Sequence, residues 1–273
     1  QACSTGGRDA PPGGGTLKRF LAAIAAASAL LLFPTSALAI TDGFPDEDNL
    51  YPFVGLLAFH DADGEYMHRC SGTLLSPTIV LTAAHCTDGT SIVYAYFSYQ
   101  VPDDFRTDPS GIEGTPYTHP DYSFPDNDIG VVVLDKRVRL GTYPVLPTEG
   151  FLSALKAAGE IQDDTFVNVG YGVLDGPTPP NLVPNEDRYW STSPYSGLTQ
   201  NSLRLLMTHS ATGQGGTCGG DSGGPHFWED TLILVSVTSW GDPNCVSLDM
   251  TQRVDLASVL DWLESEFGLA PPA

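Results

Sequence analysis

Four glycines surround an acid and an alcohol in residues 217–225, TCGGDSGGP, the stretch of this sequence best suited to chemistry. Glycine adopts backbone conformations that a side chain would block, so amide groups in such a turn can converge on one point. We expect the N–H groups of Gly220 and Ser222 to face a developing oxyanion while the Ser222 hydroxyl attacks a carbonyl carbon. A plain glycine-rich turn is the alternative, but a nine-residue pattern of this kind favours a nucleophile.

Two other fragments offer a base and an acid. His85 follows an apolar strand pattern and small residues in LTAAHC (81–86), where a disulfide at Cys86 would fix the imidazole in place. Asp128 stands at the head of the apolar run in DNDIGVVVLD (126–135), where a carboxylate can be held out of water and accept a hydrogen bond from nitrogen. Taken alone, each has an ordinary structural interpretation, a satisfied histidine and a strand-capping acid.

Together, the three fragments resemble the trypsin/chymotrypsin-like serine proteases, and the resemblance covers essentially all of the chain after residue 39. That family has a histidine after T-A-A, an acid in D-I-A-L and a nucleophile in G-D-S-G-G-P, an order that here reads His85, Asp128, Ser222. The resemblance implies a serine endopeptidase that works through an acyl-enzyme intermediate. Asp126 is a rival acid, but Asp128 has the apolar strand that the family motif requires.

The elements that must position these residues are mostly strands. Short β-rich runs bounded by turn residues indicate an all-β sandwich or barrel, and the resemblance implies two six-stranded antiparallel Greek-key β-barrels with the site between them and a C-terminal α-helix. We expect a helix in residues 253–267 with Asp255 as its N-cap, and an irregular loop in the proline-containing residues 174–197. The expected strands are residues 53–59, 70–76, 79–84, 91–101, 129–134, 165–173 and 232–240.

A leader precedes this region. Lys18 and Arg19 come before fourteen apolar residues (20–33) and the segment PTSALA, which predicts a signal peptide cut after Ala39. An uncleaved anchor is the alternative, but a membrane-spanning helix needs roughly 20 apolar residues. Residues 1–17 are rich in Gly and Pro and lack an initiator Met, so they are left out of fold reasoning. We expect residues 1–39 to be removed and residues 40–273 to form a secreted protease domain.

A cut after Ala39 would make Ile40 the first residue, in ITDG, where the family's mature chains begin with I-V-G-G. The resemblance implies that the free ammonium group of Ile40 pairs with Asp221, the acid just before the nucleophile, and thereby organises the oxyanion turn. An α-amino group titrates near pH 8, so this pair should weaken in alkali. Our hypothesis is that signal peptidase itself exposes Ile40, without a separate propeptide cleavage.

Four cysteines remain once Cys3 leaves with the leader. An even number in an exported chain indicates two disulfides, with three pairings open. A zinc site is the alternative, but the sequence has no Cys-x-x-Cys and no His pair at ligand spacing. The resemblance then implies the pairs Cys70–Cys86 and Cys218–Cys245. We expect no metal and no cofactor.

The substrate pocket departs from the pattern of family members that cleave after Lys or Arg. Those members have Asp six residues before the nucleophile, where this chain has Gly216. Counting back from the QRV motif places Asp249 where a pocket-floor glycine is usual, so Asp249 is either an acid on the other wall or a surface-loop residue. We predict broad specificity that includes Arg and Lys. Ser239, Trp240 and Gly241 complete the expected lining.

The net charge of the chain limits the kinds of molecule that it can bind. The formal charge of −21 disfavours binding to nucleic acid and anionic membranes. We expect protein or peptide substrates, no membrane contact after signal cleavage, and a monomer. A catalytically silent binding module on the same fold is the alternative function, since fold alone does not prove activity, although all three triad residues are present. A serine esterase is disfavoured because G-D-S-G-G is not the G-x-S-x-G elbow and the triad order differs.

Overall fold

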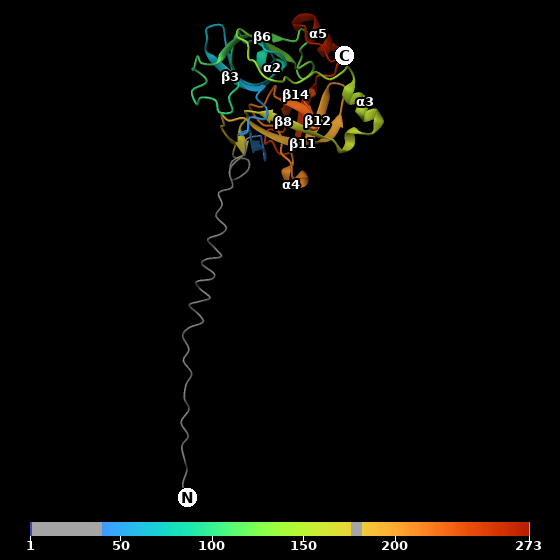
Figure 1. Cartoon of the computed structure of the whole chain (residues 1–273). Helices are drawn as coiled ribbons and strands as arrows, with labels where there is room; N and C mark the ends of the chain where they lie inside the picture. Colours follow the sequence, from blue (N-terminus) through green and yellow to red (C-terminus); the bar gives the residue numbers. More distant parts are fainter. Residues whose placement is uncertain (2–39, 176–181, 273) are drawn as a thin grey trace. The chain divides into compact units, whose positions relative to one another are not determined.

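Two rings of antiparallel strands, each closed on itself, make up the described part of the chain (Figure 1). This computed structural model describes residues 1, 40–175 and 182–272. The predicted signal peptide and its cut after Ala39 therefore lie outside the described residues. From Ile40 onward the described residues belong to one compact unit.

The first ring runs in the order β2-β3-β4-β7-β6-β5. β2 is buried along its whole length, and the apolar side chains of all six strands fill the interior. A one-turn helix, α2 (Ala84–Thr87), follows β4 directly and carries His85. The strands are β2 (Val54–His60), β3 (Tyr66–Leu74), β4 (Ile79–Thr82), β5 (Ile92–Tyr96), β6 (Ile112–Thr118) and β7 (Gly130–Leu134).

The second ring closes because β8 pairs with both β11 and β13, with β12, β15 and β14 completing the circle. Short β1 (Phe44–Pro45) extends the ring at β11, and β9 (Leu174–Asp175) pairs with β10 (Leu182–Val183). The strands of the ring are β8 (Thr165–Gly170), β11 (Tyr189–Leu198), β12 (Ser202–Leu206), β13 (Pro225–Trp228), β14 (Leu234–Gly241) and β15 (Leu248–Arg253). The remaining helices are α3 (Phe151–Ala158), η1 (Ile161–Asp163), α4 (His209–Thr212) and α5 (Ala257–Phe267).

The predicted fold class is confirmed: two six-stranded antiparallel barrels and a C-terminal helix. No helix among residues 40–175 and 182–272 is long and apolar enough to cross a membrane.

Two local predictions are wrong. The supposed irregular loop of residues 174–197 contains most of β11, whose inward-facing residues include Ser191 and Ser193, both fully buried. These small polar residues hide the usual alternation of apolar and polar positions. Asp255 does not cap the C-terminal helix, which starts at Ala257 without a side-chain cap. Instead, Asp255 accepts a hydrogen bond from the Leu152 N–H and pairs with Arg253, each at 2.8 Å.

Candidate active site

Asp128 and His85 meet where β7 and α2 come together. Asp128 precedes β7 and is fully buried, while the side chain of His85 keeps 27% of its surface exposed. The Asp128 carboxylate accepts the His85 backbone N–H through Oδ1 and the ring Nδ1–H through Oδ2, both at 2.8 Å. A carboxylate only accepts, so Nδ1 carries the ring proton and Nε2 is left with its lone pair free. This is the tautomer that a general base requires.

A third donor completes the environment of the buried acid. Ser239 Oγ donates to Asp128 Oδ2 at 2.5 Å, which helps to hold a carboxylate that has no contact with water. The rival acid Asp126 is exposed and instead accepts a hydrogen bond from Asn201 Nδ2. Of the two acids, only Asp128 orients the histidine.

The backbone around Ser222 is held from the first barrel. The Ser71 N–H donates to the Ser222 carbonyl at 2.8 Å, and Ser71 Oγ donates to the Gly220 carbonyl at 3.1 Å. Gly220 has φ of +99°, a conformation that other residues rarely adopt. Within the described part of the chain, the N–H groups of Gly220 and Ser222 donate no hydrogen bond. Both donors are therefore available to an anionic oxygen, and their role as an oxyanion hole stays a prediction.

Gly223 brings this turn against the histidine segment. A Cβ built on Gly223 would overlap Thr82 Oγ1, three residues before His85, and lie 2.7 Å from the backbone nitrogen of Ala83, two residues before it. The turn with the nucleophile can therefore approach the helix with the histidine only where the residue after Ser222 is glycine.

Gly223→Ala should therefore lower the free energy of unfolding by roughly 2 to 4 kcal/mol, from overpacking and from φ of +75°. Gly219→Ala is the matched control in the same turn, because the Cβ it adds would have Val173 Cγ2, at 3.9 Å, as its nearest neighbour. Urea denaturation of both variants measures the difference. Equal stability of the two would show that the tight contact at Gly223 does not constrain the turn.

Asp221, between the oxyanion residues, is fully buried. It accepts the Gly172 N–H at 2.7 Å and the Cys218 N–H at 2.9 Å. Burial raises the pKa of Asp221 to about 7, although these two bonds and the charge of Arg69 oppose the rise. Ile40 is also fully buried, and the next residue, Thr41, accepts the Gly216 N–H at 3.1 Å. The pairing of an Ile40 ammonium with Asp221 stays a prediction.

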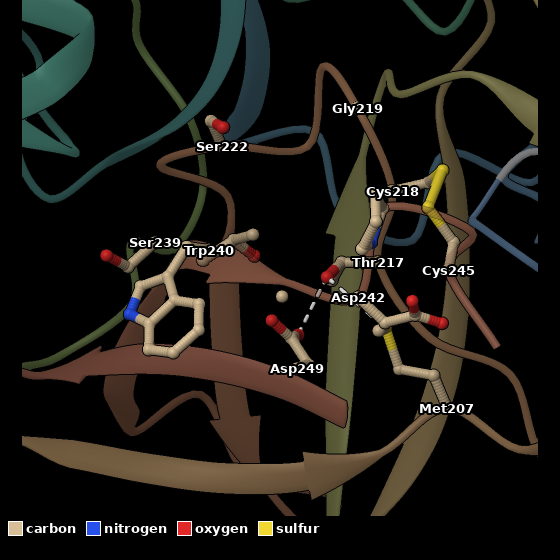
Figure 2. Close-up of a pocket in the computed structure, with 13 residues that line it drawn as sticks. Met207, Thr217, Cys218, Gly219, Ser222, Ser239, Trp240, Asp242, Cys245 and Asp249 are labelled. Carbon is tan, nitrogen blue, oxygen red and sulfur yellow. Dashed lines mark hydrogen bonds between the residues drawn. A yellow bond between two sulfur atoms is a disulfide. The ribbon is translucent and has the colours of Figure 1, made fainter. Parts of the chain in front are cut away.

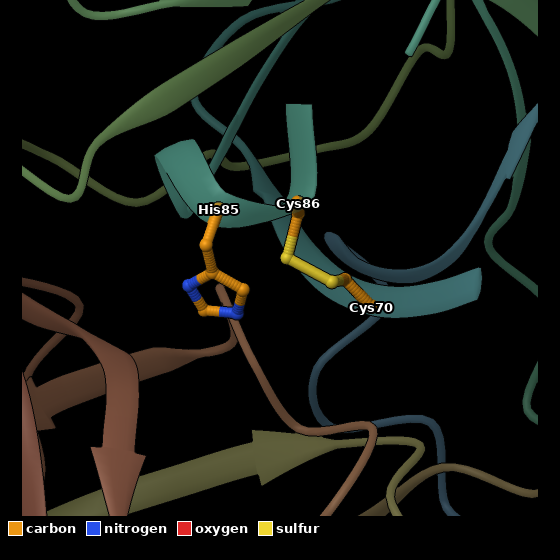
Figure 3. Close-up of side chains that lie close together, drawn as sticks. All are labelled: Cys70, His85 and Cys86. Carbon is orange, nitrogen blue, oxygen red and sulfur yellow. A yellow bond between two sulfur atoms is a disulfide. The ribbon is translucent and has the colours of Figure 1, made fainter. Parts of the chain in front are cut away.

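Disulfides join Cys70 to Cys86 and Cys218 to Cys245, the two pairs that the resemblance implies. The first disulfide anchors α2 to β3 beside His85 (Figure 3). Ligand atoms of Cys70, Cys86 and His85 lie within 4.8 Å of one another. The disulfide leaves no thiolate there, so this cluster is unsuited to binding zinc.

A pocket of about 230 Å³ opens beside Ser222 (Figure 2). Of the predicted lining residues, Ser239, Trp240, Gly241 and Asp249 line it. Gly216 does not line the pocket. It packs against Thr41 and Met207, so closely that a Cβ on Gly216 would overlap Met207 Cγ.

Asp249 is no surface-loop residue, since only 1% of its surface is exposed. Its Oδ2 accepts the Thr217 hydroxyl at 2.7 Å at the wall of the pocket (Figure 2). Burial raises the pKa of Asp249 to about 7, against the effect of the Thr217 hydrogen bond. The acid can therefore change its charge near neutral pH.

Sequence reasoning missed several lining residues. Thr217 and Cys218 belong to the TCGGDSGGP motif, so their position before the nucleophile could have indicated them. Asp242 directly follows the predicted lining residue Gly241, so its position could also have indicated it. Met207, which follows β12, lies in a segment with no motif, and nothing in the sequence pattern points to it.

Comparison with known proteins supports one family. The family model described as Trypsin matches residues 40–263. Brachyurin of Leptuca pugilator is 28% identical over 245 residues, covering 85% of this chain and all of that protein. The vitellin-degrading protease of Bombyx mori is 30% identical over 185 residues, covering 64% of this chain and 67% of that protein.

Solved structures share the fold. The structure of HL collagenase has a TM-score of 0.66 at 18% identity and covers 84% of this chain and 99% of its own. The structure of HBP has a TM-score of 0.61 at 21% identity, with 86% and 99% covered.

Proposed function

The chain belongs to the trypsin family, and from that premise we propose that it is a secreted serine endopeptidase acting through His85, Asp128 and Ser222. The observation that carries this proposal is the pair of hydrogen bonds that His85 donates to Asp128, because they leave Nε2 free to take a proton. The turn that bears Ser222 packs against the segment leading into that histidine. A base, its orienting acid and a hydroxyl nucleophile are the parts that acyl transfer needs.

In the proposed reaction the Ser222 hydroxyl attacks the peptide carbonyl carbon while His85 Nε2 takes the hydroxyl proton. The free N–H groups of Gly220 and Ser222 stabilise the oxyanion. His85 then gives the proton to the leaving amine, the peptide bond breaks and an acyl-enzyme remains. Water, activated by the same imidazole, hydrolyses the acyl-enzyme and regenerates Ser222. Asp128 keeps the tautomer and stabilises the charged ring.

Maturation is the second part of the proposal. We propose that removal of residues 1–39 frees the Ile40 ammonium, which pairs with Asp221. Burial with only backbone donors is unfavourable for a carboxylate, and the raised pKa of Asp221 expresses that cost. A cation beside it would keep Asp221 ionised and hold the oxyanion turn. Complete burial of Ile40 and the hydrogen bond to Thr41 from the N–H of Gly216, five residues before Asp221, support this assignment.

Substrate specificity is the third part of the proposal, and Asp249 is the residue that determines it. Its buried carboxylate at the pocket wall can receive a Lys or Arg side chain, while the apolar lining, with Met207 and Trp240, accepts uncharged side chains. The pocket therefore supports cleavage after several residue types, Arg and Lys among them.

Asp249→Ala should lower kcat/KM for a peptide with Arg at the cleavage site, relative to the same peptide with Leu, by at least about tenfold, the equivalent of 1.4 kcal/mol. Asp242→Asn is the control, because Asp242 lines the same pocket but accepts backbone N–H groups of its own turn from Asn244 and Val246. An unchanged preference for Arg in Asp249→Ala would show that this residue does not determine specificity.

Digestion of an unfolded protein by the chain that starts at Ile40 tests the proposed activity, with the new termini identified by mass spectrometry. We expect cleavage at internal bonds, including bonds after Arg and Lys. Absence of any cleavage would favour the catalytically silent binding module.

A further inference from the structure

We propose that Asn168 and His226 make the charge of the substrate pocket depend on pH, so that Arg and Lys are preferred at higher pH and uncharged side chains at lower pH. This inference rests on the proposed function, because it concerns the specificity of that same pocket. Asn168 and His226 do not line the pocket but lie behind Asp249, the acid in its wall. No sequence motif indicates either residue.

His226 is a fully buried histidine on β13, directly behind Asp249. Its Nε2 lies 3.4 Å from Asp249 Oδ2 and 2.9 Å from Thr238 Oγ1. Its Nδ1 lies 2.6 Å from Asn168 Oδ1, on the neighbouring strand β8. The ring therefore bridges the pocket acid and a buried amide.

Hydrogen bonds around Asn168 fix which ring nitrogen is protonated. Ser193 Oγ donates its proton to the Gly215 carbonyl at 2.8 Å, so it can only accept from Asn168 Nδ2, at 2.6 Å. The amide oxygen of Asn168 therefore faces His226, and an oxygen acceptor requires a proton on Nδ1. In the neutral ring, Nε2 then carries no proton, and its lone pair accepts a hydrogen bond from the Thr238 hydroxyl.

In this tautomer the unprotonated Nε2 of His226 lies 3.4 Å from Asp249 Oδ2, with its lone pair engaged by the Thr238 hydroxyl. Neither atom can donate, so the neutral ring cannot stabilise the ionised acid. One added proton, on either Oδ2 or Nε2, relieves this repulsion and leaves the pair with no net charge. Loss of that proton gives the pair a charge of −1, which a guanidinium or ammonium group in the pocket can then neutralise.

Other groups also surround the Asp249 carboxylate. The nucleophile turn contributes the Thr217 hydroxyl, which favours the ionised form, and Asp221, whose charge opposes it. From the turn after β14 comes Asp242, another pocket acid. The strands on either side place Leu205 of β12 and Gly241 of β14 opposite Asp249, and neither titrates. Burial raises the pKa of Asp249 to about 7 and lowers that of His226 to about 3, so the proton is lost near neutral pH.

The test is the ratio of kcat/KM for two peptides that differ only in Arg or Leu at the cleavage site, measured from about pH 5 to about pH 9. Groups that act only on the chemical step affect both peptides equally and cancel in the ratio. We expect the Arg-to-Leu ratio to rise up to about tenfold per pH unit and to level off above about pH 7, as for a single ionisation. A flat ratio would overturn the proposal.

His226→Gln separates this mechanism from simple burial of Asp249. The glutamine amide can donate to the carboxylate at every pH, so the rise should move down by about one pH unit or more. His209→Gln, a change at an exposed histidine of α4, is the control and should leave the profile unchanged. An unshifted profile in His226→Gln would show that Asp249 acts without the histidine and would also overturn the proposal.

Benzamidine binding provides a readout that needs no turnover. Calorimetry on the Ser222→Ala chain should show tighter binding as the pH rises, and equal affinity throughout would contradict the charge change. If neither peptide is cleaved by the wild-type chain but benzamidine binding still depends on pH, the proposed proteolysis fails while the inference about the pocket stands.

Discussion

Replacing Ser222 with alanine should lower kcat by about 10⁶-fold, the loss found when the nucleophile is removed from a triad that works as a unit. The substitution removes only the side-chain hydroxyl group, and the backbone carbonyl of residue 222 keeps its hydrogen bond from the Ser71 N–H. The turn should therefore remain folded. Hydrolysis of a chromogenic peptide, with enzyme concentrations high enough to follow residual turnover, measures the loss.

Ser210→Ala is the matched control, since it removes an exposed hydroxyl from α4. Its kcat should equal that of the wild-type chain, and both variants should keep the wild-type thermal transition. Wild-type turnover in Ser222→Ala would assign the nucleophile to another group.

Replacing Asp128 with asparagine should lower kcat by about 10⁴-fold, through the tautomer rather than the shape of the site. The carboxylate receives three donors: two from His85 and one from Ser239. An amide has only one acceptor oxygen. If this oxygen keeps the His85 backbone N–H, the amide nitrogen faces Nδ1 and forces its proton onto Nε2. The imidazole then cannot accept the proton of Ser222.

Asp126→Asn makes the same chemical change two residues away and decides between the two acids of the DNDIG segment. Asp126 is exposed and bonded to Asn201, so the variant should keep wild-type kcat. Comparable losses in both variants, or a larger loss in Asp126→Asn, would show that the acid has been misassigned.

Motif spacing predicts the family and its fold because the motif residues are required by local constraints. Glycines in TCGGDSGGP are required by the positive φ of Gly220 and the close contact at Gly223. Apolar strand runs predict most of the first barrel, whose strands contribute a large apolar cluster.

The second barrel is harder to predict because part of its interior is polar. Asn168, His226, Ser191 and Ser193 are all fully buried and bond to one another. In sequence, such residues look like surface positions, which is why β11 was mistaken for a loop. Their partners lie 12 to 58 residues apart and come together only when the barrel closes.

The place of Asp249 also depended on tertiary structure. The motif count allowed either a pocket wall or a surface loop, and only the pairing of β15 with β12 and β14 places the side chain inside. Helix α3 was missed because it has eight residues and a single buried one, Leu152.

Intact mass of the protein produced from the full sequence, before and after reaction with a fluorophosphonate probe, tests the proposed catalysis and maturation together. The account predicts a chain beginning at Ile40 that gains one adduct, mapped to Ser222. An adduct requires an activated nucleophile, and the N-terminal mass reports how the chain matured. A chain that begins at Ile40 and gains no adduct would contradict the proposed catalysis and identify a silent binding module.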